Sequence, residues 1–228
     1  SNVEQYILII LFSCGKILLE DEGDILDFSN YWDNIHKKYT SSYDGWLEKY
    51  LPFFNTEKVF LELGCGRAYN SKRLLELGYK NITACDLSSE VINILKDECQ
   101  ELNSFCCDIA KPLPFSDGTI DVIIADLVLH YFNNQTMREI VKELDRILDK
   151  DGYLIMRVNS SNDNYTKPGK DKEIEEEFYF DGDIYKKYYN EEELRKLFKN
   201  FTIYYIEEKK MDRYKKPKIL WELCLRKK

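Results

Sequence analysis

The stretch Val59-Phe-Leu-Glu-Leu-Gly-Cys-Gly-Arg-Ala68 decides the fold of this 228-residue chain. Its apolar run predicts a buried strand, and Gly64 with Gly66 predicts a tight turn directly after it. A helical pattern follows, and a second apolar strand, Ile82-Thr-Ala-Cys-Asp86, ends in a carboxylate. Many α/β proteins bind an adenosine-containing cofactor with such a unit, in which a strand, a glycine turn, a helix, a second strand and an acidic residue follow one another within about thirty residues. We therefore expect Asp86 to accept hydrogen bonds from both ribose hydroxyls of such a cofactor.

The same turn departs from the dinucleotide-binding fingerprint in two ways. A Gly-x-Gly-x-x-Gly loop needs a glycine at position 69, where this chain has Tyr69. Glu62, two residues before the first glycine, would repel a pyrophosphate but could bind a cation. S-adenosylmethionine has no phosphate and carries an ammonium and a sulfonium, so the pattern favours this cofactor over NAD. The alternative is that Glu62 is a buried capping residue beside a tight turn.

Three later segments predict further strands of the same sheet. Residues 105–109 predict a strand end, with Asp108 placed to accept a hydrogen bond from an adenine amino group. Residues 115–127 predict a turn and a fourth strand that delivers Asp126, and residues 144–158 predict a helix end, a glycine turn and a fifth strand. Acidic strand ends at these repeated intervals are hard to obtain by chance.

From about residue 28 to 226 the chain resembles the class I S-adenosylmethionine-dependent methyltransferases. The resemblance implies a three-layer, Rossmann-like α/β fold with a seven-stranded, mostly parallel sheet, helices on both faces and a terminal antiparallel strand. It implies S-adenosyl-L-methionine as cofactor and S-adenosyl-L-homocysteine as product. The implied cofactor contacts are Gly64, Cys65 and Gly66 at the methionine moiety, with Glu62 beside them; Asp86 and Leu87 at the ribose and adenine; Asp108 and Ile109 at the adenine; Asp126 and Leu127 near the methyl group; and Trp32 and Tyr39 as a cap.

Within that superfamily, residues 66–71 resemble the Gly-x-Gly-x-Asn-Ser turn of tellurite-resistance-type small-molecule methyltransferases. This chain has Ala68 where a glycine is usual, a sterically mild change. We expect Asn70 and Ser71 in the first helical turn, where their side chains can cap backbone donors rather than contact a ligand.

Two variable regions predict lids over the site. Trp32 and Tyr39 present aromatic faces that can close over a sulfonium, although with Ile35 they also form a helical stripe that could simply pack on the sheet. Residues 159–189 mix charge with aromatic side chains and predict a substrate lid, whereas a charge run alone is more often a solvated face. We therefore divide the chain into an N-terminal segment with cofactor-capping helices, residues 1–54, and a catalytic domain, residues 55–228, that carries the lid at about 159–189.

Composition limits the partners of the protein. The net charge of −8 argues against a nucleic-acid substrate, whose backbone would be repelled. The apolar run Tyr6–Phe12 is far shorter than the roughly twenty residues of a membrane helix, so we expect it to pack on the domain or to form a homodimer. The seven cysteines show no metal-ligand spacing and predict reduced thiols in a cytoplasmic protein without a metal site.

The predicted reaction is an in-line displacement that moves the methyl group to a small-molecule acceptor. His130, directly after the fourth strand, could face the acceptor pocket as a base, but a lone histidine there is more often structural. Asp126 is expected to position the cofactor's methionine end or the acceptor, and His36 is a weaker candidate for the base. The alternatives are methylation of a protein side chain, or cofactor binding without turnover. An oxidoreductase that uses a nicotinamide cofactor is disfavoured by Tyr69 and Glu62.

We predict that Asp86→Ala weakens binding of S-adenosylmethionine by roughly 1.5–3 kcal/mol, because it removes a charged hydrogen-bond acceptor. Calorimetric titration of the variant measures this loss. Unchanged affinity would rule out the assignment of Asp86 to the ribose.

Overall fold

The structure is a computed structural model that describes residues 16–18, 25–38 and 42–228, with side chains described from Phe28 onward. The apolar run Tyr6–Phe12, proposed above as a dimer contact, and Tyr39, proposed as a cap, lie outside the described residues.

A seven-stranded sheet forms the centre of the protein, with strand order β11-β12-β7-β6-β3-β4-β5. Its members are β3 (Phe60–Leu63), β4 (Ile82–Asp86), β5 (Asn103–Cys106), β6 (Ile120–Asp126), β7 (Leu148–Asn159), β11 (Phe201–Met211) and β12 (Lys218–Lys227). Strands β5, β4, β3, β6 and β7 pair in parallel, whereas β12 pairs antiparallel with both β7 and β11. The predicted fold, including the antiparallel strand at the end of the chain, is confirmed.

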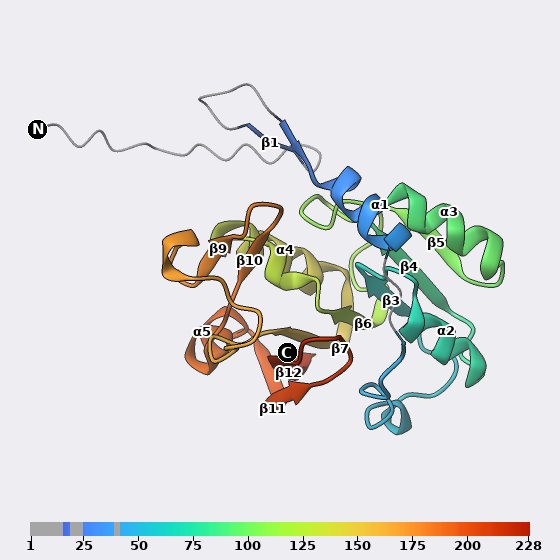
Figure 1. The fold of residues 1–228 in the computed structure, drawn as a ribbon. Coiled ribbons are helices and arrows are strands. Elements are labelled where there is room, and N and C mark those ends of the chain that lie inside the picture. The colour runs from blue at the N-terminus through green and yellow to red at the C-terminus, as the bar shows by residue number, and fades with distance from the viewer. Residues whose placement is uncertain (1–15, 19–24, 39–41) are drawn as a thin grey trace, which may run out of the picture.

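Helices cover both faces of this sheet (Figure 1). They are α2 (Tyr69–Glu76), α3 (Ser89–Glu98), α4 (Asn134–Ile147) and α5 (Glu191–Leu197). A further helix, α1 (Phe28–Lys38), instead contacts α3. Short 3-10 turns lie at η1 (Leu51–Phe53), η2 (Leu129–Tyr131) and η3 (Lys170–Lys172), and a separate two-stranded sheet joins β1 (Lys16–Leu18) to β2 (Ile25–Asp27).

The side chains of the central strands alternate between two apolar cores, as the period of a strand requires. In β6, Ile123 and Ala125 pack with α4 and α5, whereas Val122 and Ile124 pack with α2 and α3. The second core also takes in Trp46, Leu47, Tyr50, Leu51 and Phe54 from the segment before β3. This segment therefore packs on the sheet, and the proposed division of the chain at residue 54 stays a prediction.

The predicted lid contains a small antiparallel sheet of its own. It consists of β8 (Glu173–Glu175), β9 (Phe178–Phe180) and β10 (Tyr185–Lys187), in the order β10-β9-β8. Phe178 stacks on Tyr185 with ring centroids 5.3 Å apart, and the Tyr188 hydroxyl donates to the backbone oxygen of Thr166 at 3.0 Å. The aromatic side chains that the sequence placed in a lid thus build its internal packing.

None of the helices in the described ranges is long and apolar enough to cross a membrane.

We predict that Gly64→Ala destabilises the protein more than Gly78→Ala, which serves as its matched control. Both glycines have positive φ, +58° and +89°, so alanine at either costs about 1–3 kcal/mol in backbone strain. A Cβ at position 64 would also lie 2.3 Å from Cγ2 of Val128, whereas position 78 has no heavy atom within 4 Å. This overlap adds about 1–3 kcal/mol to the loss at position 64. Urea unfolding measures both losses, and equal losses would contradict the close packing of the turn.

Candidate active site

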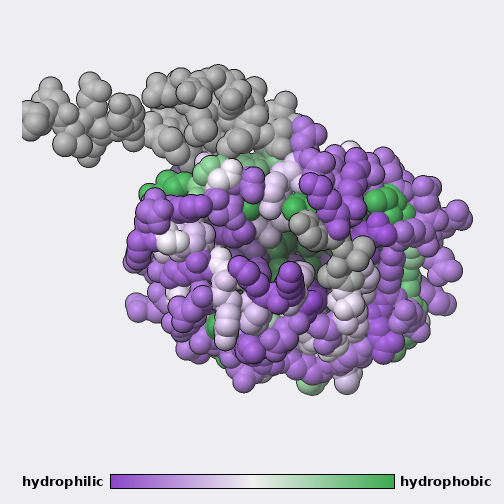
Figure 2. Space-filling view, in the orientation of Figure 1, coloured by the Kyte–Doolittle hydropathy of each residue, from purple (hydrophilic) through white to green (hydrophobic). Residues whose placement is uncertain are grey.

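One large cavity of about 790 Å³ lies at the carboxyl ends of the parallel strands. Figure 2 shows a hollow in a mostly hydrophilic face, with hydrophobic residues visible inside it. The cavity brings together the predicted residues Trp32, Glu62, Gly64, Cys65, Gly66, Asp86, Leu87, Asp108, Ile109, Asp126 and Leu127. These residues come from five separate segments, so the parallel topology gathers them, as the sequence predicted.

The glycine turn after β3 brings backbone to the floor of the cavity. Gly64 and Gly66 have φ values of +58° and +49°, which side chains disfavour. The backbone nitrogen of Cys65 donates to the Cys85 carbonyl at 2.9 Å, which ties the turn to β4. Ala68 also has positive φ, at +52°, which explains why a glycine suits this position in related turns.

Glu62 is the centre of a buried hydrogen-bond network below this turn. Its carboxylate accepts from Asn70 Nδ2 at 2.8 Å, from the backbone nitrogen of Ser71 at 3.0 Å and from the Ser71 hydroxyl. Trp46 Nε1 in turn donates to Asn70 Oδ1 at 2.9 Å. Asn70 and Ser71 lie in the first turn of α2, but their side chains hold Glu62 and do not cap backbone donors, which corrects the sequence-based expectation. Glu62 itself accepts a hydrogen bond from the helix backbone. Burial raises its pKa to about 7, although the hydrogen bonds from Ser71 and Asn70 partly lower it.

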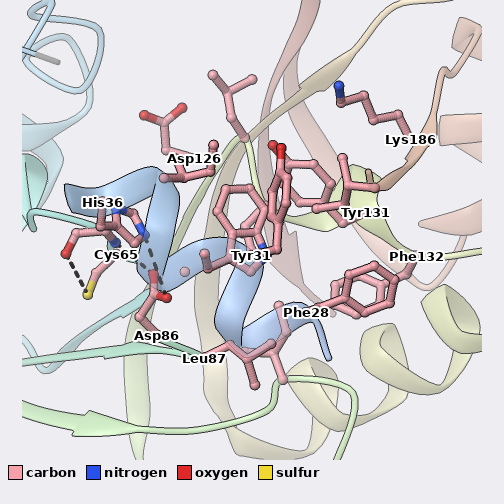
Figure 3. A pocket seen from close by; sticks show the side chains of 18 of the residues that line it. Phe28, Tyr31, His36, Cys65, Asp86, Leu87, Asp126, Tyr131, Phe132 and Lys186 are labelled. Carbon is pink, nitrogen blue, oxygen red and sulfur yellow. Dashed lines mark hydrogen bonds and ion pairs between the residues drawn. The ribbon is translucent and has the colours of Figure 1, made fainter. Parts of the chain in front are cut away.

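Asp86 stands at the end of β4, where a ribose is expected. Its oxygens accept from the backbone nitrogens of Gly66 at 2.8 Å and Ser88 at 2.9 Å. Figure 3 shows His36 of α1 beside this carboxylate, with Nε2 3.9 Å from Oδ1 of Asp86. Burial raises the pKa of Asp86 and lowers that of His36, although each group partly counters the shift of the other. His36, the weaker of the two candidates for the base in the sequence analysis, thus faces the predicted ribose site.

Asp108 and Ile109 lie beyond Asp86 along the same edge of the sheet. One oxygen of Asp108, Oδ1, accepts from the backbone nitrogen of Ala110 at 3.0 Å, which fixes the direction of the side chain. Both residues line the cavity together with Leu87. An apolar side chain on either side of a carboxylate suits a planar base with an exocyclic amino group.

Aromatic side chains form another part of the cavity wall. Trp32 makes edge-to-face contacts with Tyr31 and with Tyr131, at ring-centroid distances of 5.1 and 4.9 Å. Phe28 and Phe132 extend this wall (Figure 3). Sequence reasoning found Trp32 but missed Tyr131, which lies one residue after the proposed base.

Asp126 is held in a cluster of four charged side chains. Its carboxylate accepts from Arg157 at 2.7 and 2.9 Å and from both terminal nitrogens of Arg213 at 2.9 Å, and Arg157 also donates to Asp44 at 2.9 Å. Burial alone would raise the pKa of Asp126, but the two guanidinium groups outweigh it and lower the pKa to about 2. Asp126 is therefore a weak proton acceptor near neutral pH, and a positioning role is what its surroundings allow.

His130 does not reach the cavity, which corrects the prediction that it could face the acceptor. Its side chain is fully buried, and both ring nitrogens lack a hydrogen-bond partner among the described residues. Burial, with the nearby charges of Lys218 and Lys186, lowers its pKa well below the usual range. The residues around it form the turn η2, where consecutive side chains point in different directions, so Tyr131 enters the cavity and His130 does not.

The far end of the cavity contains cations that sequence reasoning did not assign to the site. They are Lys186 of β10, and Arg213, Lys215, Lys216 and Lys218 from the connection between β11 and β12 and its flanks. No local sequence pattern predicts that these cations line the cavity. The antiparallel register of two late strands and the contact of Arg213 with Asp126 bring the β11–β12 connection to the site.

The described residues contain neither a disulfide nor a group of side chains arranged as a metal site. Their six cysteines are free thiols, and burial raises the pKa of Cys65 well above the usual range. Across residues 16–18, 25–38 and 42–228, no group of three or more histidine, cysteine and acidic side chains is arranged to hold a metal ion.

Comparison with known proteins agrees with this site. A family described as "Methyltransferase domain" matches residues 61–156. The malonyl-[acyl-carrier protein] O-methyltransferase of Priestia megaterium is 34% identical over 97 residues, which cover 40% of this chain and 35% of that protein. The chain spans about 35–40% of the length of the curated relatives that it matches.

Solved structures show the same fold. An S-adenosylmethionine-dependent methyltransferase of Methanosarcina mazei superposes with a TM-score of 0.70 at 18% identity, covering 82% of this chain and 99% of that one. TehB of Haemophilus influenzae, a protein of the tellurite-resistance type, superposes with a TM-score of 0.65 at 20% identity, covering 86% and 66%. With the glycine turn and the acidic strand ends in place, these matches show a methyltransferase domain over residues 61–156 on the fold of the class I S-adenosylmethionine-dependent methyltransferases, with S-adenosylmethionine as its cofactor.

Proposed function

We propose that this protein transfers the methyl group of S-adenosylmethionine to a small-molecule acceptor. The observation that carries the proposal is that one cavity contains both the cofactor residues and a second, differently lined half. Its volume of about 790 Å³ falls within the roughly 300–1,000 Å³ of small-molecule sites. The lid, α1 and the β11–β12 connection all contribute to its walls, which favours an acceptor enclosed together with the cofactor.

The residues around the proposed transfer point favour positioning over proton transfer. S-adenosylmethionine already carries its leaving group, so alignment of acceptor and methyl group and exclusion of water supply much of the rate. Neither Asp126, with its low pKa, nor the enclosed His130 is suited to remove a proton from the acceptor. In this proposal Asp126 orients the reacting groups, and Trp32 and Tyr131 close the aromatic side of the site.

The lid argues against a protein substrate. A protein acceptor would need the tyrosines of the lid as a docking surface, but Tyr179, Tyr188 and Tyr189 are almost fully buried. Cofactor binding without turnover would be favoured by a lost cofactor contact, yet Ala68 is accommodated in the left-handed conformation of the turn. The free thiols of the described chain support a reducing compartment, and we propose that the protein is cytoplasmic.

We predict that S-adenosylmethionine and S-adenosylhomocysteine bind to the purified protein with micromolar affinity and that NAD does not bind, because Glu62 and Tyr69 disfavour a pyrophosphate. Calorimetric titration of the three compounds tests this. With a radiolabelled methyl group and a mixture of low-mass metabolites and proteins, the label is expected in the low-mass fraction. Binding of NAD alone would contradict the cofactor argument, and label only in acid-precipitated protein would contradict the acceptor class.

We also predict that S-adenosylmethionine binding releases protons below pH 7. Glu62 has a pKa of about 7 in the folded protein, above its ordinary value of 4.5, so its carboxyl is largely protonated at pH 6. A cationic ligand beside it favours the carboxylate, so binding at pH 6 should release up to about one proton. Calorimetry in buffers of different ionisation enthalpy counts these protons.

The variant Glu62→Gln should abolish this release, whereas Glu76→Gln, at an exposed acid of α2, should leave it unchanged. Proton release that persists in Glu62→Gln would show that another group responds to the cofactor.

A further inference from the structure

The carboxylates that line the cavity and most of its cations come from different parts of the chain; the exception is Arg67 beside the glycine turn, which pairs with Glu98 at 2.6 Å. The carboxylates Glu62, Asp86, Asp108 and Asp126 come from the ends of the parallel strands. The cations named above come from β10 and from the β11–β12 connection with its flanks. Figure 3 shows Asp86 and Lys186 on opposite sides of the cavity. In a chain whose net charge is −8, a cavity with one basic half is a specific local feature.

Two of these cations already have carboxylate partners. Lys186 pairs with Asp181 at 2.5 Å, and Arg213 pairs with Asp126 at 2.9 Å. Lys215 and Lys216 are exposed to solvent, whereas Lys218 is partly buried. No carboxylate of the described residues lies within ion-pair distance of Lys218, whose ammonium has a 3.3 Å hydrogen bond to Asn159 Oδ1 and lies 6.0 Å from the centroid of the Tyr214 ring. An enclosed ammonium without a counter-ion is unfavourable, and a bound anion would remove that cost.

The pKa of Lys218 also favours a bound anion. Burial, followed by the like charges of Lys186 and Arg213, lowers the pKa of Lys218 to about 8, although Asp163 and Asp126 partly counter this. The lowered pKa thus reflects first the loss of water around the ammonium and then its cationic neighbours, and a bound anion would counter both effects.

The side chains beside Lys218 supply few other charges. The nearby His130 is neutral, and the Nδ2 donor of the fully buried Asn159 has no partner among the described residues. The side chains that share this half of the cavity are aromatic, among them Phe178 and Tyr185 of the lid.

We propose that the acceptor is a small organic anion with a planar, apolar body, whose negative group is bound by Lys218 while its body packs between Tyr131 and Tyr185. This inference rests on the proposed function and names the substrate class of the same site. The negative group is recognised as an oxyanion, such as a carboxylate.

The test compares benzoate with benzamide, which has the same shape without the charge, on protein saturated with S-adenosylhomocysteine. We expect benzoate to bind about tenfold more tightly than benzamide, which is the effect of one charged hydrogen bond. Lys218→Met should remove this preference and leave benzamide binding unchanged. Lys210→Met is the matched control, because Lys210 is an exposed lysine of β11 that does not line the cavity, and it should change neither affinity.

The pH dependence gives a second readout. Lys218 is charged below its pKa of about 8, so benzoate affinity should fall as pH rises through that value, while benzamide affinity stays constant. Lys218→Met should make benzoate binding independent of pH in this range.

Each contrary outcome identifies what has failed. Equal binding of benzoate and benzamide, no binding of benzoate, or an unchanged preference in Lys218→Met would overturn the anionic acceptor. If Lys218→Met weakens S-adenosylhomocysteine binding as much as it weakens benzoate binding, the lysine binds the cofactor and not the acceptor. If S-adenosylhomocysteine does not bind the unaltered protein, the proposed function itself fails.

Discussion

The ion pair between Arg157 and Asp126 is the interaction on which the arrangement of the site depends. It joins the ends of β6 and β7 at the middle of the cavity, and Arg157 also binds Asp44 from the segment before β3. Arg213 completes the cluster from the β11–β12 connection, so four separate parts of the chain meet at one buried point. Removing one partner of such a cluster leaves an uncompensated buried charge, which costs about 3–5 kcal/mol. The cluster therefore fixes where the β11–β12 connection, with its cations, meets the cofactor residues.

This arrangement divides the cavity by charge. On one side, parallel strand ends present carboxylates that suit the hydroxyls, the amino group and the positive charges of S-adenosylmethionine. On the other, the lid and the β11–β12 connection present aromatic rings and lysines. Asp126 lies between the two and keeps its negative charge because the guanidinium groups lower its pKa. A methyl group transferred between the halves would pass a fixed carboxylate in surroundings enclosed by aromatic side chains, where electrostatic interactions are stronger than in water.

The parts that could be predicted from sequence are those set by local pattern. The glycine turn, the place of Asp86 at a strand end and the positions of the central strands along the chain follow from apolar runs and turn residues that are close in the sequence, and the architecture of the sheet is implied by the family resemblance. The roles of Asn70 and Ser71 could not be predicted in this way, because their partner Glu62 lies across the turn and accepts hydrogen bonds from both side chains and from the backbone nitrogen of Ser71. Tyr131 and His130 are neighbours in a single 3-10 turn and their side chains point in different directions. Hydrophobic periodicity does not predict which of the two enters the cavity. Arg213 and Lys218 make side-chain hydrogen bonds to Asp126 and Asn159, which lie 87 and 59 residues away in the sequence, and a local pattern does not contain such long-range contacts.

The division of the cavity into a cofactor half and an acceptor half is tested most directly by a crystal structure with S-adenosylhomocysteine bound. The account predicts that both ribose hydroxyls donate to Asp86, that the adenine lies by Asp108 and Ile109, and that the sulfur faces the side of Asp126. It also predicts that Lys218 makes no contact with the ligand. A ligand whose carboxylate binds Lys218, or whose adenosine lies against Tyr185, would contradict the account.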